Sequence, residues 1–180
     1  MTITIVLTEE DYLTYLLYSA SKSKRAQGTR RKAWLTISGL LLVMGAAMLT
    51  SNDGFYSYYF FAAGLMSLVF YPLLQRYSYK KNYRKFVRDK MAYKIGKESI
   101  LKFGTEYIET KDITGESRIN TSEVAEINEI ASHYFIRLKS GDGLVVPKTS
   151  VATPTFVDDV MSVMQNPDIL VTHEPNWKWK

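Results

Sequence analysis

Two long stretches without a charged residue constrain this chain of 180 residues more than any other feature. Residues 33–50 read AWLTISGLLLVMGAAMLT, and residues 55–74 read FYSYYFFAAGLMSLVFYPLL. At a helical rise of about 1.5 Å per residue they would be roughly 27 and 30 Å long, close to the hydrocarbon thickness of a bilayer. A soluble chain of this length would have little protein left to cover two helices that are apolar on every side. We therefore predict a transmembrane hairpin over residues 33–74.

Charges beside the hairpin predict its orientation. Basic residues flank both ends, whereas the turn at residues 51–54 holds one acid and no base. Because Lys and Arg are retained on the cytoplasmic side during insertion, both termini are expected in the cytoplasm. The predicted basic flank consists of Arg30, Arg31, Lys32, Arg76, Lys80, Lys81 and Arg84.

Aromatic and small residues fit the same interpretation. Amphipathic rings favour the membrane–water interface, and glycines such as Gly39, Gly45 and Gly64 would let the two helices pack closely. The tail also holds two Trp residues, which either enter the headgroup region or belong to a frayed terminus. The predicted interface residues are Trp34, Tyr56, Tyr59, Tyr71, Tyr77, Trp177 and Trp179.

The segments that border the hairpin have weaker patterns. In residues 1–32, period-two alternation over residues 2–7 predicts a strand, and Thr8 is the expected N-cap of an amphipathic helix that leads to the basic flank. Residues 75–96 read as a basic helical stalk that ends near Gly96.

Residues 97–180 change to short β-like runs separated by turn signals, of which residues 140–143 should close a hairpin. Thr153 and Pro154 then indicate a helix start, and an apolar stripe continues to about residue 166. We expect a compact antiparallel domain closed by a C-terminal helix. Whether the N-terminal strand joins it is left open. The six predicted strands begin near Ser99, Tyr107, Ser117, Val124, His133 and Leu144.

Few residues suggest a catalytic, metal-binding or cofactor-binding site. The chain has no cysteine, and its two histidines are forty positions apart, so neither a metal site nor a cofactor is expected. We expect His133 at the surface or at a sheet edge, and Glu123, Glu126 and Glu129 to face solvent. The net charge of +5 gathers beside the hairpin, which argues against nucleic-acid binding. No motif typical of an enzyme is present, and we predict a non-enzymatic protein.

The chain resembles the bacterial YcxB-like family over nearly its whole length. The residues that carry the resemblance are Gly115-Glu116-Ser117, the EVAEINE run from Glu123, Tyr134-Phe135 and Val146-Pro147-Lys148. The resemblance implies an α+β membrane protein of the bacterial inner membrane, with a two-helix transmembrane hairpin and a small antiparallel β domain like a pleckstrin-homology (PH) domain. It supplies no catalytic residues.

Three functions remain open from the sequence. The first is a PH-like domain that is tethered at the cytoplasmic membrane surface and binds a protein. The second is an immunity protein that protects the cell from a membrane-acting or secreted toxin. The third is recognition of anionic lipid headgroups, with candidate binding residues Lys102, Arg118, Lys139 and Lys148. Membrane lipids and a protein, in the second case a toxin, are the expected partners, and the oligomeric state is not predicted.

Overall fold

The computed structural model describes residues 1–50, 54–151, 153 and 155–179. It divides into two compact units, one of Met1–Tyr15 with Arg84–Lys178 and one of Leu16–Tyr83 with Trp179. Residues 51–53 of the predicted turn and Pro154 of the predicted helix start lie outside the described residues.

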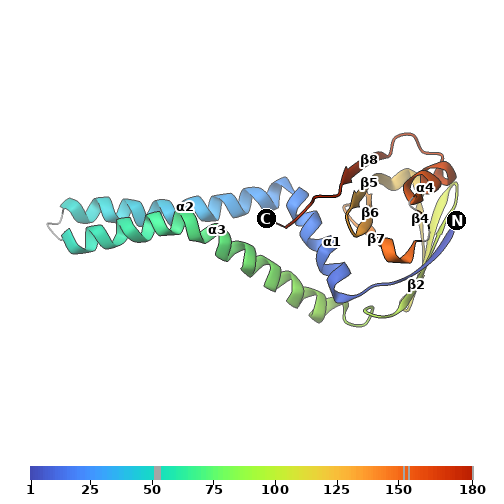
Figure 1. Ribbon diagram of the computed structural model, residues 1–180, viewed down its shortest axis with the longest axis horizontal. Coiled ribbons are helices and arrows are strands. Elements are labelled where there is room, and N and C mark those ends of the chain that lie inside the picture. The colour runs from blue at the N-terminus through green and yellow to red at the C-terminus, as the bar shows by residue number, and fades with distance from the viewer. Residues whose placement is uncertain (51–53, 152, 154, 180) are drawn as a thin grey trace. The chain divides into compact units, whose positions relative to one another are not determined.

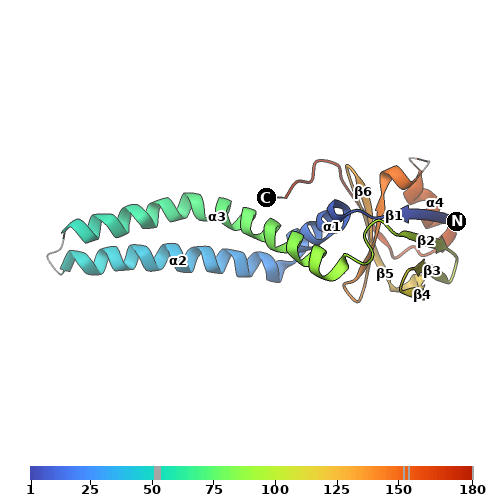
Figure 2. The ribbon, with the colours of Figure 1, turned by 90° about the horizontal axis from the view of Figure 1, so that it is seen from below.

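Two long helices dominate the second unit. They are α2 (Lys24–Thr50) and the first part of α3 (Gly54–Met91), which lie side by side in opposite directions (Figures 1 and 2). Both are long and apolar enough to cross a membrane. Only 11% of the most apolar stretch of each helix is buried. The predicted helical hairpin is therefore confirmed as a pair of packed apolar helices.

Small residues bring α2 and α3 together. The hydroxyls of Ser38 and Ser67 are 2.9 Å apart. A side chain at Gly64 would place its Cβ 2.6 Å from Leu42, so a larger residue would push the helices apart. The prediction that Gly39 lets the two helices pack closely is wrong, because nothing lies within 4 Å of the position that a Cβ at residue 39 would occupy.

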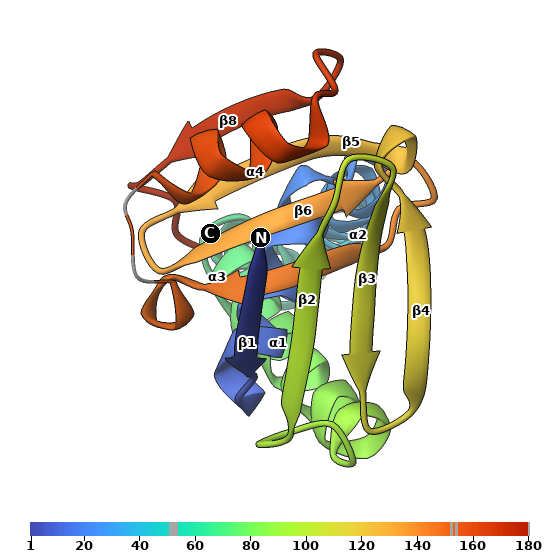
Figure 3. The same cartoon turned by 90° about the vertical axis from the view of Figure 1, so that its right-hand side faces the viewer.

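The N-terminal strand belongs to the first sheet of the other unit. Its four antiparallel strands lie in the order β1 (Thr2–Val6), β2 (Glu98–Phe103), β3 (Tyr107–Asp112) and β4 (Gly115–Asn120) (Figure 3). Alternate residues of β1 are buried, as the period-two pattern predicts. The structure thus joins residues that precede the helices to strands that follow them.

The second sheet lies in the order β7 (Gly143–Pro147), β6 (His133–Leu138), β5 (Val124–Ile130) and β8 (Leu170–Glu174). The prediction of an all-antiparallel domain is wrong, because β8 pairs with β5 in parallel. After α4 (Phe156–Met164) the chain returns along β5 and enters the sheet in the same direction. Parallel neighbours require such a crossover connection.

The core lies between the two sheets, whose strands cross in Figure 3. Leu101 and Ile108 come from the first sheet and Ile127 from the second, and each is at most 3% exposed. The helix α4 adds Phe156, whose ring lies 5.9 Å from Phe103 and 4.8 Å from Tyr134. Burial of this apolar area is the main contribution to the stability of the unit.

The outer face of the second sheet is covered by the first half of α1 (Glu9–Lys22). Tyr15 packs on Phe135 of β6, with ring centroids 5.5 Å apart. Thr8 caps this helix as predicted, because its hydroxyl accepts a hydrogen bond from the amide of Asp11 and donates one to the Asp11 carboxylate. As a consequence β6 is buried on both of its faces.

Candidate functional site

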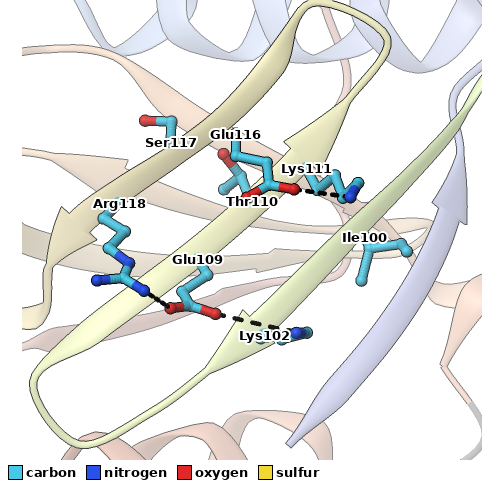
Figure 4. A pocket seen from close by; sticks show the side chains of 8 residues that line it. All are labelled: Ile100, Lys102, Glu109, Thr110, Lys111, Glu116, Ser117 and Arg118. Carbon is cyan, nitrogen blue, oxygen red and sulfur yellow. Dashed lines mark ion pairs between the residues drawn. The ribbon is translucent and has the colours of Figure 1, made fainter.

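The exposed surface of β2, β3 and β4 carries a ladder of alternating charges, which we call the charged face (Figure 4). In one row, Glu109 of β3 lies between Lys102 of β2 and Arg118 of β4, at 4.0 and 2.9 Å. In the next row, Lys111 pairs with Glu116 at 2.7 Å. These five residues surround a shallow hollow of about 290 Å³.

Strand alternation explains the charged face. Leu101 and Phe103 point into the core, so Lys102 between them points outward. Opposite charges on neighbouring strands stabilise the register of the antiparallel pairs. The hydrogen bond from Lys111 lowers the pKa of Glu116 and raises that of Lys111, so both groups are charged at neutral pH.

The structure brings together two of the four candidate binding residues. Lys102 and Arg118 share the charged face, with side chains 59% and 72% exposed. Lys139 lies in the exposed turn after β6, and Lys148 lies after β7, where its amine donates a 2.6 Å hydrogen bond to Glu129. The four cations therefore do not form one cluster.

The placement expected for His133 is wrong, because its side chain is buried. It is 7% exposed, and Nε2 lies 2.8 Å from the Asp11 carboxylate while Nδ1 lies 2.7 Å from the Ser132 hydroxyl. Burial of Asp11 opposes its ionisation, but the hydrogen bonds from Thr8 and His133 outweigh that effect and lower its pKa. Because residues 11 and 133 meet only through the tertiary fold, no local sequence pattern could reveal this pair.

Two of the three glutamates are also less exposed to solvent than predicted. Glu126 pairs with Arg137, and Glu129 accepts hydrogen bonds of 2.6 Å from both Lys148 and His173. Each carboxylate is 24% exposed, because β8 lies beside β5. The hydrogen bond from Lys148 is the main cause that lowers the pKa of Glu129. Glu123 is exposed, as predicted.

The contacts of Ser132, His133 and Asp11 resemble the order of a nucleophile, a base and an orienting acid. In catalytic arrangements the serine contacts Nε2 and the acid contacts Nδ1, whereas here these contacts are exchanged. The hollow of the charged face does not open on these residues. Among the described residues, no group of three or more His, Cys, Asp or Glu side chains is placed to hold a metal ion.

A second hollow, of about 370 Å³, lies between the two sheets and was not predicted; we call it the inter-sheet cavity. Its apolar wall comes from β1, β2 and β7, and its polar rim from α1, β3 and the end of α3. Lys94 donates a 2.8 Å hydrogen bond to Asp112 at this rim. Its lining residues come from six separate parts of the chain, so no sequence motif marks it.

The predicted interface aromatics fall into two groups. Tyr56, Tyr59 and Tyr77 of α3 are more than half exposed, and Trp34 and Tyr71 are partly exposed. Their contact with lipid remains a prediction. The second group lies in the tail, where Trp177 is partly exposed and its amide donates a 3.0 Å hydrogen bond to the carbonyl of Glu174.

Trp179 is not part of a frayed end. It is 8% exposed, and its indole N–H donates to the carbonyl of Arg76 at 3.3 Å. The guanidinium of Arg30 lies 4.8 Å from the ring centroid, a cation–π contact. Two residues of the predicted basic flank therefore hold the end of the chain.

The other basic-flank residues differ in their surroundings. Arg84 pairs with Glu9 and Glu10 of α1. The remaining four, Arg31, Lys32, Lys80 and Lys81, are exposed.

Comparison with known proteins adds no relative, since no family model, curated protein or solved structure matches this chain.

Proposed function

We propose that this chain is a non-enzymatic protein of the bacterial inner membrane that holds a protein-binding domain at the cytoplasmic surface. The observation that carries the proposal is the exposure of α2 and α3. Only 11% of the most apolar stretch of each helix is buried. Apolar helices without a protein cover are stable when lipid solvates them. The basic flanks support the orientation with both termini inside.

The charged face is the proposed docking surface. Its three cations and two carboxylates alternate across three strands, and four of the five side chains are more than half exposed. A partner protein with the opposite alternation can pair with every charge, which favours one register over others. The resemblance to the YcxB-like family implies a PH-like domain, and the two sheets with the helix α4 are consistent with a binding role.

An anionic lipid surface fits the charged face less well. Each cation there lies beside a carboxylate, so headgroup phosphates would meet Glu109 and Glu116 as well as the three cations. Lys139 and Lys148 are too separate to add to the same site. We therefore favour a protein partner over lipid headgroups.

Photo-crosslinking in intact cells tests this surface. A photoreactive amino acid replaces Tyr107 of β3, which is 44% exposed and lies on the same side of the strand as Glu109, in the full chain. We expect a discrete protein adduct that is lost when Lys102→Glu and Arg118→Glu are combined. Electrostatic pairing should also make the adduct weaker at high salt.

The matched control places the same photoreactive group at Ser140, in the exposed turn after β6. The proposal predicts no such adduct there. Equal adducts at both positions, or an adduct that survives the double charge reversal, would contradict it. Adducts with lipid alone at Tyr107 would instead favour headgroup binding.

A further inference from the structure

We propose that the inter-sheet cavity binds a small amphiphile that combines a short apolar chain with one anionic group, of the kind a medium-chain fatty carboxylate provides. This site shares Lys111 with the proposed docking surface, and its other lining residues lie outside the charged face. Its apolar wall includes Ile5, Leu101 and Val145, each at most 5% exposed. The volume of about 370 Å³ lies at the small end of the range for small-molecule sites, about 300–1,000 Å³.

The charge of the cavity rim favours an anion. Two cations, Lys90 and Lys94, line the cavity with a single carboxylate, Asp112, whereas the third lining lysine, Lys111, already pairs with Glu116 of the charged face. Lys90 is exposed at the rim, and it forms no ion pair with any residue that the structure describes. An anionic ligand group would therefore gain a cationic partner without breaking an existing pair.

The single carboxylate at the rim does not offset these cations, because its own partners already occupy it. One oxygen of Asp112 accepts the hydrogen bond from Lys94, and the other accepts one from the amide of Thr114 at 2.7 Å. Lys94 has three N–H donors, and two remain after this contact. They can bind an anion while the pair with Asp112 stays in place.

Tyr12 provides a neutral donor at the same rim. Burial raises the pKa of its phenol above 10, so the hydroxyl is protonated at neutral pH and can donate a hydrogen bond. The hydrogen bond to Asp112 raises the pKa of Lys94, which stays charged. Cationic and neutral donors thus lie above an apolar wall, the arrangement that an anionic amphiphile requires.

Photoaffinity labelling of the full chain tests the inference. The chain is reconstituted in nanodiscs of phosphatidylcholine and exposed to a decanoate probe with a diazirine near the end of its chain. We expect labels on the peptides that contain Met91 or Leu144. An excess of decanoate should suppress this labelling at least fivefold, whereas decanol, which lacks the charge, should not. Decyl phosphate in a parallel arm distinguishes a phosphate head from a carboxylate head.

Variants on one helix provide matched controls. Lys90→Glu reverses a rim charge and should reduce labelling at least fivefold, whereas Lys85→Glu, exposed on the same helix outside the cavity lining, should not. Leu144→Trp should reduce labelling by filling the space. All three residues lie outside the charged face, so failure here leaves the proposed docking surface intact. Labels confined to residues 33–74, equal suppression by decanol, or equal effects of the two lysine variants would overturn the inference.

Discussion

Asp112 shows how much a single residue contributes through its surroundings. Its carboxylate accepts hydrogen bonds from Lys94, which follows α3, and from Thr114 in the turn before β4. Burial opposes ionisation of this group, but the hydrogen bonds from Lys94 and Thr114 outweigh it and lower the pKa from 3.8 to about 2. The ionised carboxylate therefore stabilises the folded chain.

Replacement of Asp112 should make stability less sensitive to acid. A carboxyl with a lowered pKa stabilises the fold above its unfolded pKa of 3.8, and that stabilisation is lost as the pH falls through about 2. We expect Asp112→Asn to lower the free energy of unfolding by about 1 kcal/mol at pH 7 and by progressively less between pH 4 and 2. Urea unfolding of the full chain in detergent at several pH values measures this. Asp142→Asn, in an exposed turn, is the control, and a difference independent of pH would contradict the account.

At the scale of elements, β8 depends on its contact with Glu129. The strand is only partly buried, and His173 bonds to the same carboxylate that holds Lys148. Glu129→Gln should make the amides of residues 171–173 exchange about fivefold faster, equivalent to about 1 kcal/mol. Hydrogen exchange with mass spectrometry measures this. Glu126→Gln, which removes a contact to β6, should leave β8 unchanged, and equal effects would show that Glu129 has no specific role.

The packing of α2 against α3 gives a second prediction at this scale. The chain has no cysteine, so Ser38→Cys with Ser67→Cys introduces one pair whose parent hydroxyls are 2.9 Å apart. We expect this pair to form a disulfide on oxidation, measured by loss of thiol labelling. Adding Gly64→Leu should greatly reduce the yield, because its side chain would overlap Leu42. Gly39→Leu is the matched control, and the same loss of yield there would refute this packing.

The elements that sequence patterns predicted well are those fixed by local periodicity. The long helices, β1 and the turn at residues 140–143 follow from uncharged length, alternation and glycine. The strand β8 was missed because its residues, LVTHE, lack a clear alternation and its partner lies forty-four positions earlier. The burial of His133 and the inter-sheet cavity were missed because both depend on segments brought together by the tertiary fold.

At the scale of the whole molecule, the two units differ in how much of their apolar surface they bury. The β unit buries its own apolar core and includes both the first residues and residues 84–178. The helical unit exposes most of its apolar surface, which in water would favour aggregation and in lipid is favourable. This contrast supports the proposal that the helical unit lies in a bilayer and the β unit in water.

The most direct test is the accessibility of single cysteines to a membrane-impermeant maleimide. Asn52→Cys probes the predicted outer turn, and Ser140→Cys probes the β unit, each in the chain that otherwise has no cysteine. We predict that intact spheroplasts are labelled at residue 52 only, and that residue 140 reacts after lysis. Labelling at residue 140 in intact spheroplasts, or recovery of the chain in the soluble fraction without detergent, would contradict the central claim.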